Sequence, residues 1–174
     1  ADLAEPLMAD VEVHRIHADL HLGNVLLRDD QFHLLDFDDM CSGPAVQDMW
    51  LAFPGRDEET RELRDSFLSG YEQFRLFDRS NLRLIEPLRG MRMVRYAVWL
   101  ARRWHDPAFR VGWPHFGTFE YWEGETRDLE EQVSVICAEN QGDVAVGGLV
   151  ETLAADGSNE ELTNKDYFWD WEGE

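Results

Sequence analysis

The chain has 174 residues, of which 44% are hydrophobic, so it is long enough to bury a sizeable core. Its 36 acidic side chains outnumber its 16 Lys and Arg side chains and give a formal net charge of -20 at pH 7. This charge argues against nucleic-acid binding, which needs basic surface to neutralise phosphates. The sequence shows no signal peptide, no apolar run near the ~20 residues of a membrane helix, and no metal spacing of its two cysteines. We therefore expect a cytoplasmic protein with no membrane partner.

Hydrophobic spacing predicts the first elements along the chain. Residues 2–10 are typical of the end of a helix, and residues 11–16 are typical of a short strand. The apolar segments 25–27 and 32–35 flank Arg-Asp-Asp-Gln, which is a turn-forming tetrapeptide. These two segments therefore predict a β-hairpin.

The rest of the folded part is predicted to be helical. A helix begins within residues 42–53, and further helices cover 57–77, 82–104 and 118–139, with a loop rich in Pro and Gly before the last one. The sequence changes at Asn140, where it becomes acidic and loses a clear period. The predicted fold class is α+β, a small β-hairpin region followed by a helical bundle over residues 1–139, with a disordered acidic tail over 140–174.

The predicted helix over 82–104 carries six arginines, at positions 83, 89, 92, 95, 102 and 103. They could form a cationic patch for an acidic or phosphorylated partner. In so acidic a chain, we expect them to pair with Asp and Glu of neighbouring helices instead.

Residues 15–39 combine three His and six Asp with short apolar segments. Asp29 and Asp30 are explained by the turn of the predicted hairpin. Asp19, Asn24 and Asp36 lie at strand ends beside apolar segments, where neighbouring acids repel one another unless a cation or a donor compensates. The segment therefore suggests a site with a chemical role.

One interpretation of this segment is a dinuclear metal hydrolase. Ala-Asp-Leu-His-Leu-Gly-Asn resembles the Asp-x-His block of calcineurin-type metallophosphoesterases, in which Asp19 and His21 would be ligands. The further blocks of that family, Gly-Asp-x-x-Asp and Gly-Asn-His, do not occur in this sequence. A metal site needs its full ligand set, so this interpretation is the remote alternative.

The other interpretation is phosphoryl transfer. The pattern His17-x-Asp19-x-x-x-x-Asn24, followed after the hairpin by Asp36, resembles the catalytic and metal-binding loops of the kinase-like fold. The resemblance implies that Asp19 is the proton acceptor, with Asp36 beside it as a catalytic residue. It also implies that Asn24 and Asp36 bind Mg²⁺ and, through it, ATP. His17 is expected to support the loop by packing and hydrogen bonding.

The resemblance narrows when longer segments are included. His-Ala-Asp-Leu-His-Leu-Gly-Asn resembles the Brenner-type motif of aminoglycoside phosphotransferases and choline kinases, with Ala18 in place of the usual Gly. Gly-Pro-Ala-Val-Gln-Asp-Met-Trp resembles the helix that follows in that superfamily, which implies that Asp48 braces the catalytic loop. The arginine-rich helix and the segment Trp-Pro-His-Phe-Gly-Thr-Phe-Glu-Tyr-Trp also resemble one family, the stress response kinase A family of bacterial Ser/Thr protein kinases. Together these segments extend the resemblance over residues 10–138. The resemblance implies phosphorylation of a protein substrate.

Kinases of this fold also cover ATP with a lobe that supplies a glycine-rich loop and a lysine. The sequence contains no Gly-x-Gly-x-x-Gly, and its only lysine is Lys165. We therefore expect residues 1–139 to be the C-terminal lobe of a kinase, whose partner is an N-terminal lobe absent from this sequence. The alternative is a catalytically inactive lobe fragment or a binding module.

Overall fold

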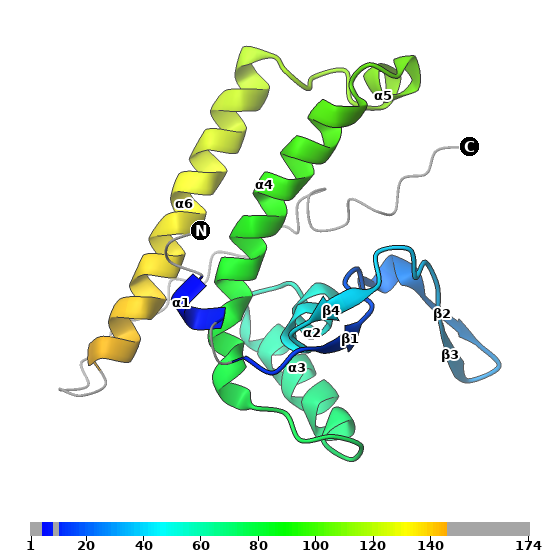
Figure 1. The fold of residues 1–174 in the computed structure, drawn as a ribbon, viewed down its shortest axis with the longest axis vertical. Coiled ribbons are helices and arrows are strands. Elements are labelled where there is room, and N and C mark those ends of the chain that lie inside the picture. The colour runs from blue at the N-terminus through cyan, green and yellow to red at the C-terminus, as the bar shows by residue number, and fades with distance from the viewer. Residues whose placement is uncertain (1–4, 9–10, 146–174) are drawn as a thin grey trace. The chain divides into compact units, whose positions relative to one another are not determined.

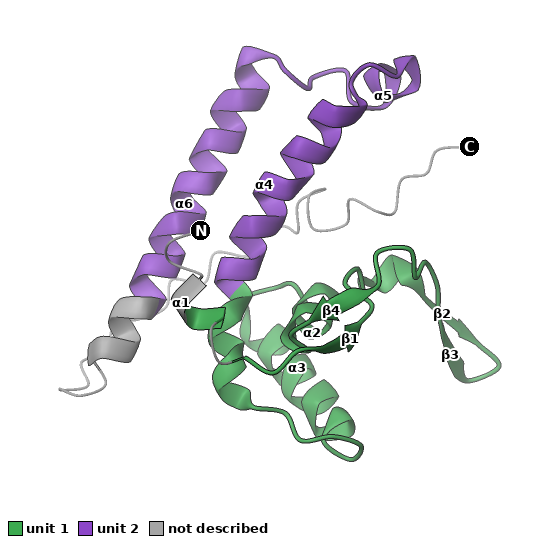
Figure 2. Ribbon diagram, in the orientation of Figure 1, with its two compact units in different colours: residues 1–85, 153–174 green, residues 86–152 purple. Residues whose placement is uncertain are grey.

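The computed structural model describes residues 5–8 and 11–145, which fall into two compact units (Figures 1 and 2). The described part of unit 1 ends at Ile85, and unit 2 begins at Glu86. The expected mixture of helices and small sheets is confirmed. Most of the predicted acidic tail, residues 146–174, lies outside the described residues. Among the residues that are described, no helix combines the length and the apolar composition needed to cross a membrane.

Unit 1 contains two antiparallel two-stranded sheets. In the first, β1 (His14–Ile16) pairs with β4 (Cys41–Gly43). In the second, β2 (Val25–Arg28) pairs with β3 (Gln31–Leu34), which confirms the predicted hairpin. Strand β4 was not predicted, because three residues give no recognisable alternation and its pairing with β1 depends on the tertiary fold.

The turn between β2 and β3 explains the two acids at positions 29 and 30. Asp29 and Asp30 have φ angles of 52° and 58°, in the left-handed region that Asp tolerates better than most residues. Two central residues with positive φ form the tight turn that matches the twist of a hairpin. The interpretation of these two acids as turn residues is therefore confirmed.

The helices of unit 1 form its core. They are α1 (Glu5–Met8), α2 (Val46–Ala52) and α3 (Glu58–Tyr71), together with the 3-10 helices η1 (Leu22–Asn24) and η2 (Arg79–Leu84). The most deeply buried apolar side chains come from α2, α3 and η2: Val46, Met49, Trp50, Leu68 and Leu84. The core therefore lies beside the first turns of α2.

Helix α3 differs from its prediction at the C-terminal end. Asp57 caps its N-terminus by accepting a hydrogen bond from the backbone N–H of Thr60 at 2.8 Å. The helix ends at Tyr71 rather than at residue 77. Phe74 and Leu76 beyond it are 92% and 89% exposed, so the predicted extension is wrong and the apolar period in 72–77 does not mark a buried face.

Unit 2 consists of α4 (Ile85–Arg103) without its first residue, α5 (Pro107–Gly112) and α6 (Phe119–Ala145), with α4 and α6 side by side (Figure 1). The side chain of Gln132 in α6 donates to the backbone oxygen and to the carboxylate of Glu86 in α4, at 2.9 and 2.8 Å. Gly90 faces α6, where an added Cβ would be in ordinary van der Waals contact with Gln132, at 3.4 Å. The predicted helical bundle is therefore divided between two units, and α6 extends past its predicted end at residue 139.

Aromatic side chains fill the end of unit 2 at which α5 lies. The Trp113 indole N–H donates to the Tyr96 hydroxyl at 2.8 Å, and the Trp99 ring contacts Phe109 at a centroid distance of 5.1 Å. Arg103 lies 4.2 Å above the Trp99 ring, a cation–π contact. Arg89 pairs at 3.2 Å with Glu86 of its own helix.

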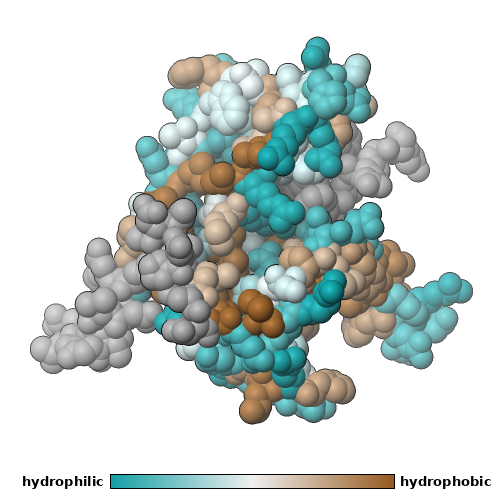
Figure 3. All heavy atoms as spheres, in the orientation of Figure 1, coloured by the Kyte–Doolittle hydropathy of each residue, from teal (hydrophilic) through white to brown (hydrophobic). Residues whose placement is uncertain are grey.

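The β2–β3 hairpin extends away from the rest of unit 1 (Figure 1). Its large apolar side chains are exposed; they include Leu26, Leu27, Phe32 and Leu34. Figure 3 shows hydrophobic atoms gathered toward the base of the hairpin, with hydrophilic atoms at its tip. The two strands of the hairpin are joined by backbone pairing and a short turn, while neither of its faces is buried.

Candidate active site

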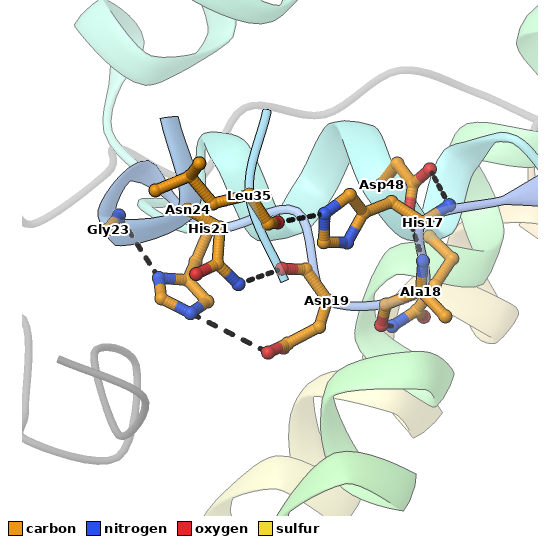
Figure 4. Close-up of polar contacts among 9 residues, drawn as sticks. His17, Ala18, Asp19, His21, Gly23, Asn24, Leu35 and Asp48 are labelled. Carbon is orange, nitrogen blue, oxygen red and sulfur yellow. Dashed lines mark hydrogen bonds and ion pairs between the residues drawn. The ribbon is translucent and has the colours of Figure 1, made fainter. Parts of the chain in front are cut away.

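The loop between β1 and η1, residues 17–21, is held by α2. Asp48 lies in the first turn of α2, and its two carboxylate oxygens accept hydrogen bonds from the backbone N–H groups of His17 and Ala18, both at 2.8 Å (Figure 4). Burial raises the pKa of Asp48, while these two hydrogen bonds and the nearby His17 oppose that rise. Asp48 thus connects the core helix directly to the backbone of the loop.

The backbone at Ala18 is in the left-handed region, with a φ angle of 70°. Only glycine adopts this region without a steric penalty from Cβ. The position therefore explains physically why the resembled motif has Gly after its first His. The alanine is accommodated where Asp48 fixes two consecutive backbone N–H groups.

His17 connects the loop to the strand that leads to Asp36. Its Nε2 lies 2.7 Å from the backbone oxygen of Leu35, an acceptor, so Nε2 carries the proton. The ring is 6% exposed and packs against Phe37 at a centroid distance of 4.8 Å. These contacts agree with a supporting role for His17.

Asn24 occupies the junction between the loop and the hairpin. Its side-chain amide donates from Nδ2 to the backbone oxygen of Asp19 at 3.0 Å (Figure 4). Its backbone oxygen accepts from the Leu35 N–H at 2.9 Å. With Nδ2 used in this way, Oδ1 is the atom of Asn24 that could bind a cation. Asp36 follows Leu35 directly and is exposed, with a φ angle of 57°. Asn24 and Asp36 therefore come from the same end of the hairpin.

These oxygen atoms suit Mg²⁺. Mg²⁺ prefers oxygen ligands and usually keeps several waters, so it needs only one or two protein carboxylate or amide oxygens. Asn24 Oδ1 and the Asp36 carboxylate are such donors. Across residues 5–8 and 11–145, no group of three or more His, Cys, Asp and Glu side chains could hold a metal ion.

Two side chains that contact the loop were not predicted as site residues of a kinase. Nε2 of the His21 ring lies 3.6 Å from Oδ2 of Asp19. Nδ1 of the same ring accepts a hydrogen bond from the backbone N–H of Gly23 at 3.1 Å (Figure 4). Gln47 in α2 donates to the backbone oxygen of Ala18 at 3.4 Å. Both were present in the quoted motifs, but only the fold shows what they contact.

The geometry also bears on the metal-hydrolase alternative. In that interpretation, Asp19 and His21 would be ligands of the same metal. One ring nitrogen of His21 already accepts a backbone hydrogen bond, and the other faces Asp19 itself. The contacts of His21 therefore favour a role within the loop.

The loop, the hairpin and the bracing helix have counterparts in proteins of known class. Residues 1–85 match the phosphotransferase enzyme family, APH. The similarity to particular proteins extends further along the chain. The chain is 43% identical over 127 residues to stress response kinase A of Escherichia coli (strain K12). The matched residues make up 73% of this chain and 38% of the relative.

Further relatives match over the same share of the chain. Stress response kinase A of Shigella flexneri is 41% identical, and the serine/threonine protein kinase RdoA of Salmonella typhimurium is 40% identical, each over 127 residues. The predicted resemblance to stress response kinase A is thus confirmed. The chain spans 38% of the length of each of these relatives.

Proposed function

We propose that this chain supplies the catalytic lobe of an ATP- and Mg²⁺-dependent Ser/Thr protein kinase that acts in the cytoplasm during a bacterial stress response. The observation that carries the proposal is one polar network in unit 1. It joins the loop that contains Asp19 to α2 through Asp48, and to the end of the hairpin through Asn24 and Leu35. Phosphoryl transfer depends mostly on positioning of this kind and on electrostatic stabilisation.

In the proposed reaction, Asp19 orients the hydroxyl of a Ser or Thr in the protein substrate and accepts its proton. The hydroxyl oxygen bonds to the γ-phosphorus of ATP while the bond from that phosphorus to the bridging oxygen breaks, and ADP leaves. Asn24 and Asp36 would hold Mg²⁺, which neutralises phosphate charge when bound. His17 and Asp48 hold the loop in place.

The proposal includes a partner that covers ATP. A kinase needs a glycine-rich loop and a lysine on the other side of the phosphates, and this sequence has no lysine before Lys165. We infer that these groups come from an N-terminal lobe outside the 174 residues. Kinase chemistry and a protein acceptor are motivated by the names of the relatives, stress response kinase A and serine/threonine protein kinase RdoA.

The test compares Asp19→Asn with the unmodified sequence in a lobe-completed protein, meaning this chain joined to an ATP-binding lobe encoded beside it or taken from a relative. The substitution preserves size and removes the proton-accepting carboxylate. We expect kcat for transfer of labelled phosphate to a Ser/Thr protein substrate to fall on the order of 10²-fold or more. Asp30→Asn makes the same chemical change in the hairpin turn and should leave kcat unchanged.

The outcomes separate the possible functions. Near-normal turnover in Asp19→Asn, or full activity without Mg²⁺, would contradict the proposed mechanism. A lobe-completed protein with no activity at all would favour the inactive fragment or binding module. The 174-residue chain alone should fold and transfer no phosphate, because the phosphates of ATP would lack the donors that the second lobe supplies. Transfer by that chain above its own Asp19→Asn variant would show that the second lobe is unnecessary.

A further inference from the structure

The contacts of His21 define which of its ring nitrogens carries the proton. His21 precedes η1 as its N-terminal cap, and its Nδ1 accepts the backbone N–H of Gly23 at 3.1 Å. A backbone N–H can only donate, so Nδ1 has no proton, and the neutral ring carries its proton on Nε2. The ring is 1% exposed, so its orientation is fixed by the surrounding fold.

The protonated nitrogen faces the predicted base. Nε2 of His21 lies 3.6 Å from Oδ2 of Asp19, whose side chain is also buried, with 3% of the residue exposed (Figure 4). This separation is longer than a hydrogen bond, but contacts among catalytic groups commonly shorten when substrate binds. In a buried setting, an N–H dipole aimed at a carboxylate has more effect than it would in water.

We propose that His21 is a positioning residue for Asp19. Its Nε2–H holds the Asp19 carboxylate in one orientation, so the same oxygen meets the substrate hydroxyl in each turnover. Gly23 contributes by fixing the ring tautomer through its backbone. This inference rests on the proposed function, because it assumes that Asp19 is the base. It assigns His21 a role in the rate of the chemical step and none in binding ATP.

Two substitutions distinguish the role of Nδ1 from the role of Nε2. His21→Asn places an amide oxygen near the position of Nδ1, so it can still accept the Gly23 N–H, but it has nothing that reaches Asp19. His21→Gln places an amide N–H near the position of Nε2 and keeps a donor toward Asp19. A purely structural role in capping η1 would favour Asn over Gln, whereas a positioning role favours Gln over Asn.

The kinetic test uses both variants in the lobe-completed protein. We expect His21→Asn to lower kcat about tenfold with an unchanged KM for ATP, and His21→Gln to retain kcat within about threefold. Equal loss in both variants, or retained kcat in His21→Asn, would overturn the inference. If Asp19→Asn itself left kcat unchanged, the proposed function would fail, which is a distinguishable result.

A spectroscopic measurement keeps the inference testable if the variants unfold. Nitrogen NMR of the 174-residue chain labelled at histidine should show His21 protonated on Nε2. Replacing Asp19 by Asn should shift the Nε2 resonance of His21 and leave that of His33, on the exposed hairpin, unchanged. Protonation on Nδ1, or no response of His21 to the change at Asp19, would overturn the inference independently of kinase activity.

Discussion

Ala18 is a single residue whose backbone conformation favours another amino acid. Its φ angle of 70° brings Cβ into conflict with the neighbouring backbone, a cost that glycine does not have. Glycine also gives the unfolded chain more freedom, which opposes the gain. For Ala18→Gly we expect the free energy of unfolding, measured with denaturant, to stay level or rise by up to about 1 kcal/mol.

Ala45→Gly is the matched control for this prediction. Ala45 precedes α2 with a φ angle of -58°, where an alanine is unstrained. The same substitution there should lower the free energy of unfolding by roughly 0.5–1 kcal/mol, because only the entropy of the unfolded chain changes. A loss at Ala18 as large as that at Ala45 would mean that the left-handed backbone carries no strain.

For single residues, the sequence indicates which candidate side chains share the loop, but it does not indicate what each of them contacts. Asp19 and Asn24 lie within one short motif, so their roles could be proposed from local order. The tautomer of His21 depends on the Gly23 N–H, and the position of Gln47 depends on where α2 packs. Such contacts are set by the tertiary fold, which a motif does not encode.

In unit 2, the ionisation of Tyr96 provides a prediction about the packing of α4. Burial raises the pKa of Tyr96 to about 12, the hydrogen bond from Trp113 opposes this, and the charge of Glu125 adds to it. The neutral phenol is thus favoured in the folded state. Its contribution to stability is complete below the ordinary tyrosine pKa of about 10 and is lost as pH rises through about 12.

Spectrophotometric titration of tyrosine ionisation provides the measurement. The folded chain should show a component with a midpoint near 12 that is missing from Tyr96→Phe. In denaturant all tyrosines should ionise together near the ordinary value of about 10. Burial also raises the pKa of Tyr121, so a late component remains in the variant. A folded titration identical in the two proteins would contradict the burial of Tyr96.

Elements with a strong local signal could be predicted, and short ones could not. The β2–β3 hairpin follows from two apolar segments and a turn. Strand β4 has three residues and exists only because β1 lies beside it. Helix α5 was missed although Asp106 caps it and Pro107 begins it, because six residues within a Pro- and Gly-rich segment suggested a loop.

Net charge gives a prediction for the whole molecule. The formal charge of -20 makes the compact state repel itself, and dissolved salt screens that repulsion. We expect the thermal midpoint to rise by a few degrees as sodium chloride increases from about 20 mM to about 300 mM. The salt should be a chloride, because sulfate also strengthens apolar burial and would raise the midpoint for a second reason.

The opposite response would indicate a different balance of charges. Exposed ion pairs such as Arg79 with Asp65, at 2.7 Å, are weakened by the same salt. Each such pair contributes little, so their sum should be smaller than the general repulsion. A midpoint that falls with salt would show that the ion pairs dominate instead.

The division into two units was beyond sequence reasoning. Periodicity shows that a helix has an apolar face, but it does not identify the element that covers it. Helix α4 illustrates this, because Glu86 accepts hydrogen bonds from Gln132 of α6 that no pattern in α4 alone reveals. One bundle is the simplest prediction for consecutive helices. In the structure, the helices fall into two compact units instead.

The two bonds from Asp48 to the loop also affect when the loop becomes ordered. Both acceptor atoms belong to α2, so the backbone of His17 and Ala18 is fixed once the core around α2 has formed. The conformational entropy of these residues is then lost during folding and not during each encounter with substrate. A preorganised loop of this kind can meet successive substrates without rebuilding its geometry. The core helix thereby determines in advance how Asp19 is presented.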